Sequence, residues 1–373
     1  MSDTWISFNG NALSLNGYGL VVSGQNPYNP LNLPAYTVRF QFDDSSYDPT
    51  QVSGWKAGSA WTRVSTSPNI WDYYTGTVYG ATASAYSYTF GNKFRDNANT
   101  VHVLGAYLPQ LSMVFPQDGA NFFEGCTALV STGIVDFSGF TALNGTFKGC
   151  ANLSTMDTIY AINATGFQNA FIECTSLTTS PYIVAGSNLR SVYNMFDKCS
   201  SLSQVTVFDT STVSVFNSMF SYCSSLQTAP SLNTSSATTF DGMFLRCTGL
   251  SSVPLYDMSN AISTIGMFST CTSLTSSPIF NTGRVTNSSA MYSGCQSLTT
   301  VPLLNTANNT NVENMFSGCY SVQSGSLSLY NQMSSQSFPP SSYSGCFNNC
   351  GRDSVTGAAE LAQIPTSWGG TMA

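Results

Sequence analysis

A short pattern of residues returns every 24 positions along more than half of this chain. The cysteines mark it most clearly, because Cys199, Cys319 and the cysteines of the pattern between them are spaced by 24 residues. The pattern extends backwards to Cys126, with one extra residue between Cys174 and Cys199. A period of this length predicts a solenoid, in which each repeat packs on the repeats before and after it.

Apolar residues keep fixed distances from each cysteine. Leucine follows it by three residues, with Val322 in the last copy, and methionine precedes it by four residues from Met195 to Met315. An aromatic residue precedes each cysteine by three residues: Phe123, Phe147, Phe171, Phe196, Phe220, Phe244, Phe268, Tyr292 and Phe316. With so many registered positions, we expect the aromatic residues to superpose as a ladder.

Each repeat contains a helical and an extended pattern. Residues 240–247, FDGMFLRC, have apolar side chains at i, i+3, i+4 and i+7, which share one face of a short helix. Leu250, Val253 and Leu255 follow as the inward side of a short strand. Prolines at the start of these strands are compatible with this interpretation, because a first residue needs no donor. We therefore predict a continuous parallel sheet on one side of the solenoid and short helices on the other.

The repeats carry a resemblance to a known family. The segment Met219–Pro230, MFSYCSSLQTAP, is similar to the BspA-like class of leucine-rich repeats, written M-F-x-x-C-x-S-L. The resemblance covers residues 121–322 and implies an α/β solenoid with a parallel sheet and short convex helices. Repeats of this class occur in surface proteins of gut and oral bacteria and of protists, and in structural proteins of phages that infect gut bacteria.

Composition excludes some partners. Charged residues make up only 8% of the chain, against about 25% in ordinary domains, so Ser, Thr, Asn and Tyr must form the surface. The net charge of −7 and the eleven Lys and Arg residues argue against nucleic acid, because phosphate binding needs a basic patch. Membrane insertion is also not expected, since no apolar run approaches about 18 residues.

The cysteines are expected to be structural. The N-terminal segment lacks the basic region and cleavage site of a secretory signal, so we expect a reducing cytoplasm that keeps the eleven cysteines as thiols. Beside Met and Phe they would act as small buried hydrophobes, with disulfides or a metal as the alternatives. Cys346 and Cys350 lie outside the period, and we expect packing in a terminal cap rather than a zinc site.

The chain divides into four segments. Residues 1–35 contain two Asn-Gly steps and a proline-rich stretch, which predict an N-terminal arm that anchors the protein. Residues 36–106 show alternating patterns typical of strands and predict a β-rich cap. Residues 107–322 form the repeats, and residues 323–373 form a helical C-terminal cap over the last repeat.

The N-terminal arm suggests oligomerisation. Its apolar residues have little to pack on within their own fold, so we expect them to be buried against partner copies. Projections on virus particles commonly have cyclic symmetry, which favours a trimer by analogy. The expected anchor residues are Trp5, Ile6, Phe8, Leu13 and Leu15.

The sequence does not predict an enzyme. Its single histidine, His102, lies in a strand-like run, and without a second candidate we expect no Ser-His-Asp or Cys-His constellation. Asp43 and Asp44 lie in a loop that we interpret as solvated, with a bound calcium ion as the alternative. No cofactor is expected.

A stripe along the sheet is the candidate binding surface. The residue after each inward strand position is apolar and, by alternation, should point outward, unless the register is shifted by one and the stripe is core. An Asp or Asn follows it in a turn, where it bonds backbone N–H groups. If the protein binds a host carbohydrate or surface protein, the expected contacts are Phe208, Tyr256 and Phe280, oriented by Asp209, Asp257 and Asn281.

Together these features favour a non-enzymatic structural protein of a phage virion, such as a fibre, decoration or tail component, which is assembled in the host cytoplasm. Its partners would be other virion proteins, copies of itself and a host surface. The alternative is a bacterial cell-surface adhesin of the BspA type.

Overall fold

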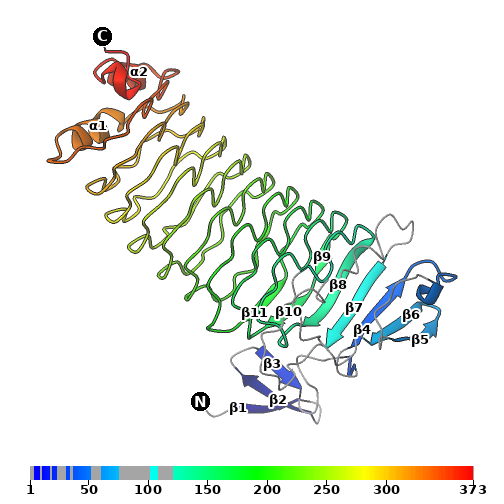
Figure 1. The fold of residues 1–373 in the computed structure, drawn as a ribbon. Coiled ribbons are helices and arrows are strands. Elements are labelled where there is room, and N and C mark those ends of the chain that lie inside the picture. Colours follow the sequence, from blue (N-terminus) through cyan, green and yellow to red (C-terminus); the bar gives the residue numbers. More distant parts are fainter. Residues whose placement is uncertain are drawn as a thin grey trace, which may run out of the picture.

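Successive 24-residue repeats stack as the rungs of a long solenoid (Figure 1). The computed structural model describes residues 4–8, 11–16, 19–22, 31–33, 37–51, 60–74, 101–107 and 121–372. Ring centroids of the predicted aromatic ladder lie 5.1 Å apart for Phe123 and Phe147, 5.5 Å for Phe220 and Phe244, and 5.1 Å for Tyr292 and Phe316. The repeat fold expected from the sequence is confirmed.

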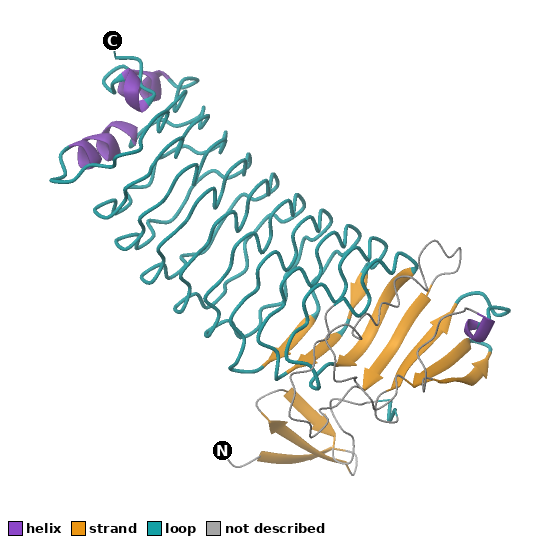
Figure 2. Cartoon of the chain, viewed as in Figure 1, coloured by secondary structure: helices purple, strands orange, loops and turns teal. Residues whose placement is uncertain are grey.

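The expected convex helices are wrong, because the segment before each cysteine is a series of tight turns (Figure 2). Ser218 and Tyr222 have φ of 54° and 58°, the left-handed conformation that ends a right-handed helix. The N–H groups then alternate between two kinds of acceptor. The Cys223 N–H bonds Phe220 O of its own turn at 3.0 Å, whereas the Phe220 N–H bonds Met243 O of the next rung at 2.9 Å.

The cysteines form a second buried ladder. All eleven are free thiols and buried. Most donate to the carbonyl of the aromatic residue one rung back, as Cys247 Sγ does to Phe220 O at 3.0 Å and Cys295 Sγ does to Phe268 O at 3.1 Å. Each of these carbonyls also accepts the backbone N–H of the cysteine in its own turn, such as Cys223 for Phe220 O, so the thiol is a second donor that ties neighbouring rungs together.

A single sheet joins the N-terminal strands to the first rungs. Its order is β11-β10-β8-β7-β4-β6-β5, and β9 also pairs with β8. Strands β7 to β11 pair in parallel, whereas β4 pairs antiparallel with both β6 and β7. The bounds are β4 Thr37–Phe42, β5 Ala60–Thr66, β6 Asn69–Tyr74, β7 Val101–Tyr107, β8 Leu129–Asp136, β9 Thr155–Met156, β10 Thr158–Ala161 and β11 Tyr182–Ala185, with a 3-10 turn, η1, at Pro49–Gln51.

The predicted continuous sheet does not extend along the whole solenoid. Beyond β11 the described rungs are linked on this side by isolated bridges such as Thr228↔Ser252 and Thr300↔Ser324. Pro230, Pro254, Pro278 and Pro302 each remove one backbone donor on this side, which limits strand pairing in their rungs.

Three further strands lie near the N-terminus. β1 (Thr4–Phe8), β2 (Asn11–Asn16) and β3 (Gly19–Val22) form an antiparallel sheet in the order β1-β2-β3. The side chains of the predicted anchor residues lie outside the described part of the chain, so their burial against partner copies stays a prediction. They are Trp5, Ile6, Phe8, Leu13 and Leu15.

An extra rung, which the 24-residue spacing does not reveal, ends the solenoid. Residues 342–350 take up the bonding pattern of the previous turn, for example through the Phe316 N–H and Cys346 O at 2.8 Å. Phe347 stacks on Phe316 at 6.0 Å, so Cys350 occupies the cysteine position of this rung. The insertion before this rung contains α1 (Ser326–Ser334), which shifts the spacing.

The C-terminal residues cover this rung. After α2 (Val355–Leu361), the 3-10 turn η4 (Thr366–Trp368) brings Trp368 O to accept from the Phe347 N–H at 2.9 Å. Trp368 also stacks on Tyr343 at 4.3 Å. Within the described residues, no helix has the length and apolar character needed to cross a membrane.

Candidate functional site

The predicted binding stripe is buried, so its assignment to the outer face is wrong. Tyr256 and Phe280 are each 1% exposed, and Phe208 is also buried. Tyr256 stacks on Phe280 at 6.4 Å and donates from its hydroxyl to Pro230 O at 2.8 Å. The alternative interpretation of the sequence, in which the stripe is core, therefore holds.

The residues one position earlier face solvent instead. Leu255 is 69% and Ile279 is 64% exposed, although the sequence pattern placed Leu255 inside. Equivalent positions of other rungs are also exposed and apolar, and we call the set the outer ladder: Tyr182, Val207, Leu255, Ile279 and Leu303. Ser231 interrupts it. Apolar side chains exposed in register over several rungs are typical of interaction surfaces.

The predicted orienting groups have a local structural role. Asp209 accepts from the Ser211 N–H and Asp257 accepts from the Ser259 N–H, both at 2.9 Å, and Asn281 makes the same bond to Gly283 at 3.4 Å. Hydrogen bonds from the two serines lower the pKa of Asp209 and of Asp257. Each side chain thus closes its own turn, as expected for Asp and Asn in this position.

A groove lies on the turn side of the solenoid. We call it the turn-side groove, and it holds about 460 Å³. Two surface columns form it, one immediately before and one immediately after the buried cysteines. Its lining residues are Thr175, Lys198, Ser200, Tyr222, Ser224, Arg246, Thr248 and Thr270. Sequence reasoning missed this site, because its cations stand 48 positions apart and join only through the stacking of rungs.

Two cations and one aromatic ring define the groove chemically. Lys198 Nζ bonds Glu173 Oε1 at 2.7 Å, and this bond raises the pKa of Lys198. The Arg246 guanidinium lies 5.2 Å from the ring centroid of Tyr222, within the range of a cation–π interaction. Among the described residues, no carboxylate forms an ion pair with Arg246. Arg246 therefore keeps its hydrogen-bond donors available.

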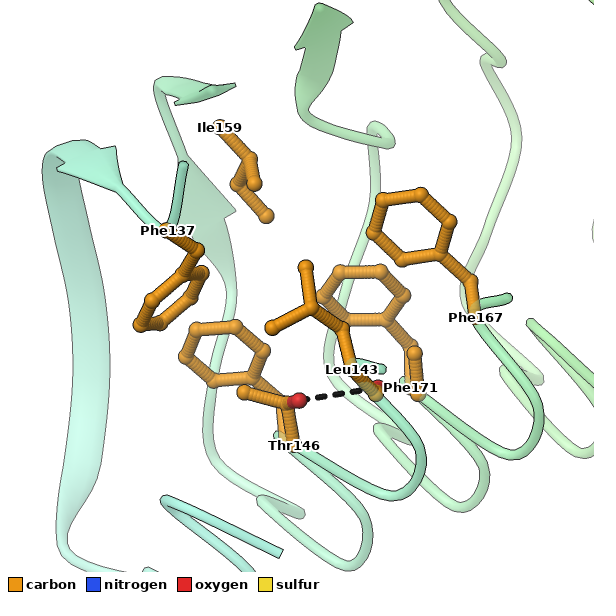
Figure 3. A pocket seen from close by; sticks show the side chains of 8 residues that line it. Phe137, Leu143, Thr146, Ile159, Phe167 and Phe171 are labelled. Atoms are coloured by element: carbon orange, nitrogen blue, oxygen red, sulfur yellow. Dashed lines mark hydrogen bonds between the residues drawn. The ribbon is translucent and has the colours of Figure 1, made fainter. Parts of the chain in front are cut away.

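A gap inside the solenoid is a packing feature rather than a ligand site. Phe137, Leu143, Ile159, Phe167 and neighbouring side chains surround it (Figure 3), and it has no room for a water-sized molecule. Its lining hydroxyl, on Thr146, already donates to Leu143 O at 2.8 Å. The core near the first rungs is therefore dry and closed.

The structure brings a serine, a histidine and an aspartate together, although no such arrangement was expected from the sequence. His102 Nδ1 lies 2.6 Å from Ser131 Oγ, and its Nε2 lies 3.2 Å from Asp43 Oδ1. However, β7 and β8 are each paired on both sides at these positions, His102 with Gln41 and Ser131, and Ser131 with Thr155. The backbone N–H groups at these positions are therefore committed to the sheet and do not contribute to an oxyanion hole. The contacts from Ser131 to His102 and from His102 to Asp43 link the sheet to the loop after β4.

A family of repeat proteins matches the solenoid. The family described as "Mycoplasma protein of unknown function, DUF285" matches residues 141–252, 165–279 and 190–330, which together span just over half of the chain. The chain belongs to this family. It is a BspA-like leucine-rich-repeat protein, as the M-F-x-x-C-x-S-L pattern indicated.

Other comparisons add little to the DUF285 assignment. A leucine-rich repeat protein from Eubacterium ventriosum, solved by crystallography, has 14% sequence identity and a TM-score of 0.30. The match covers 67% of this chain and 90% of that one. A search of curated proteins found no match.

The Cys346–Cys350 pair and the Asp43–Asp44 loop of this DUF285 protein are the remaining candidates for a metal site. In the part of the chain that the structure describes, no three His, Cys, Asp or Glu residues lie close enough to hold a metal ion. Cys346 and Cys350 are buried in the extra rung, in the positions that Met and Cys occupy elsewhere. Asp44 accepts from both the N–H and the hydroxyl of Ser46, at 2.8 and 2.6 Å. These bonds close the loop, and calcium binding there stays an open alternative from the sequence.

Proposed function

We propose that this protein is a non-enzymatic display protein, in which the solenoid presents an elongated recognition surface. The observation that carries the proposal is the outer ladder, which exposes apolar side chains in register over several rungs. Exposing Leu255 and Ile279 to water has no benefit for folding, whereas a partner that covers them gains their burial. Their regular spacing suits an extended partner surface better than a small molecule.

The proposed location is a phage virion, as a fibre, decoration or tail component. Support comes from the resemblance of the M-F-x-x-C-x-S-L repeats to structural proteins of phages that infect gut bacteria. The charge-poor surface fits a particle component that must not bind nucleic acid in the host cytoplasm, because eleven Lys and Arg residues cannot form an extended basic patch.

Quantitative mass spectrometry of purified particles and of cell envelopes tests this location. We expect the protein in particles at a fixed ratio to the other particle proteins. Recovery from envelopes alone would overturn the virion assignment and favour a BspA-type cell-surface adhesin.

The proposed anchor is the N-terminal arm, and the proposed assembly is a homo-oligomer, with a trimer favoured by analogy. Deletion of residues 1–34 should leave a folded chain, because the core cluster of the described residues begins at Val38 in β4, after the deleted segment. The truncated protein should sediment as a monomer and should not enter particles. Normal incorporation of the truncated protein would exclude the arm as the anchor.

A further inference from the structure

The column of residues immediately before the buried cysteines has a strained backbone at the turn-side groove. Its residues have positive φ in every rung, and glycine takes this position toward both ends of the regular series, at Gly125, Gly149, Gly294 and Gly318. The rungs between them have non-glycine residues in the same conformation, including Lys198 at 62°, Tyr222 at 58° and Arg246 at 59°. A left-handed non-glycine residue costs about 1–2 kcal/mol. Strain of this kind concentrates at functional sites.

The charge of the groove selects an acidic ligand. Lys198 and Arg246 flank Tyr222 along the column, in a chain whose net charge is −7. Lys198 is already bonded to Glu173, so Arg246 is the cation available to an incoming group. A guanidinium can bind a carboxylate through two parallel hydrogen bonds, which a lysine ammonium cannot do. The net negative charge of the chain repels a polyanion more strongly than a ligand with one carboxylate.

The rest of the lining is suited to a sugar. Tyr222 is 39% exposed and offers an aromatic surface against which the apolar face of a sugar ring can pack. Ser224 Oγ donates to Ser200 O at 3.3 Å and Thr175 Oγ1 donates to Ala151 O at 3.2 Å. Since these hydroxyls have used their donors, their lone pairs can accept hydrogen bonds from sugar hydroxyls. The volume of about 460 Å³ lies within the usual range for small-ligand sites.

We propose that the turn-side groove binds an acidic sugar, with its carboxylate on Arg246 and its ring on Tyr222. The inference rests on the proposed recognition function, because it names the ligand class of one surface of the displayed solenoid. The outer ladder remains a separate surface for a larger partner.

Titration of the purified full-length chain with sialyllactose and with lactose tests this proposal. Isothermal calorimetry or ligand-observed NMR should show that sialyllactose binds at least about tenfold more tightly, because lactose lacks the carboxylate. The difference should shrink at high ionic strength. Arg246→Gln should weaken sialyllactose binding about tenfold and leave lactose binding unchanged. Tyr222→Asn, which keeps a residue that tolerates positive φ, should weaken both.

Arg284→Gln is the matched control. It removes the same charge from an exposed arginine outside the groove, which bonds Asn260 at 3.1 Å, so binding should be unchanged. Thermal melts of all variants should confirm folding. Equal affinity for the two sugars, wild-type affinity in Arg246→Gln, or an equal loss in Arg284→Gln would each overturn the proposal. These binding outcomes are independent of the particle analysis, so the groove can fail while the display function stands.

Discussion

The burial of Tyr256 and the exposure of Leu255, its neighbour, lead to a sharp prediction. Two double variants exchange apolar side chains for alanine in the same two adjacent rungs. One variant, Leu255→Ala with Ile279→Ala, changes the outer ladder. The other, Tyr256→Ala with Phe280→Ala, changes the buried stripe. The first should fold like the wild type, and the second should lose most of its stability.

The magnitudes follow from burial. Loss of a fully buried aromatic ring costs about 3–5 kcal/mol, and truncation of Tyr256 also removes the donor to Pro230 O. The two rings stack on each other at 6.4 Å, so their losses will not add fully. Even so, a loss of about 5–8 kcal/mol is comparable to the stability of a typical domain. Exposed substitutions usually stay within about 0.5 kcal/mol.

Chemical denaturation followed by circular dichroism measures both changes, and an attachment assay with assembled particles measures function. The outer-ladder variant should keep its denaturation midpoint and lose attachment. The buried variant should unfold at much lower denaturant concentration. If the outer-ladder variant were the unstable one, the register described here would be wrong. If it were stable and attached normally, the outer ladder would not be the recognition surface.

Four further predictions follow from individual contacts. Burial raises the pKa of Asp197, so its ionised form disfavours folding; Asp197→Asn should raise the melting temperature at pH 7, and the gain should vanish near pH 3, where the carboxyl is protonated in both states. The thiols should not react with a thiol reagent until the chain unfolds, since all are buried and burial raises the pKa of Cys319 to about 12. Glu360 accepts from Ser326 Oγ at 2.6 Å and from the Leu327 N–H at 3.1 Å, so Glu360→Ala should destabilise the C-terminal region by about 1–3 kcal/mol and speed hydrogen exchange in α1. Thr270 is β-branched with φ of 62°, so Thr270→Gly should stabilise the chain by about 1 kcal/mol in the same denaturation assay.

The ladders were predictable from the sequence because burial makes them repeat. A side chain between two identical neighbours must fit both, so Phe244 and Cys247 have equivalents in rung after rung. The helix prediction failed for a related reason. The spacing of apolar residues does not distinguish a helix from a series of turns that contain left-handed residues. The sequence signal for the turns was glycine or asparagine at the left-handed positions, such as Gly242 and Asn314.

The register of the outer face was not predictable in the same way. Strand alternation assigns faces only where a strand is continuous, and beyond β11 the described rungs are linked on this side by isolated bridges alone. Leu255 and Tyr256 are both apolar, so hydrophobicity could not decide which one is inside. Their sizes and the hydroxyl bond to Pro230 O decide it, and these depend on the neighbouring rung.

Buried and exposed columns of the solenoid differ in how far their residues can vary, and this difference explains where function can vary. A buried column must keep one chemistry along the solenoid, because each member packs on the next. An exposed column has no such restriction, and the groove column runs from Glu173 through Lys198, Tyr222 and Arg246 to Thr270 while the cysteines beside it stay constant. Recognition in such a fold is therefore encoded across rungs, by residues 24 or 25 positions apart. Contiguous sequence motifs cannot reveal it, whereas alignment of the rungs column by column can.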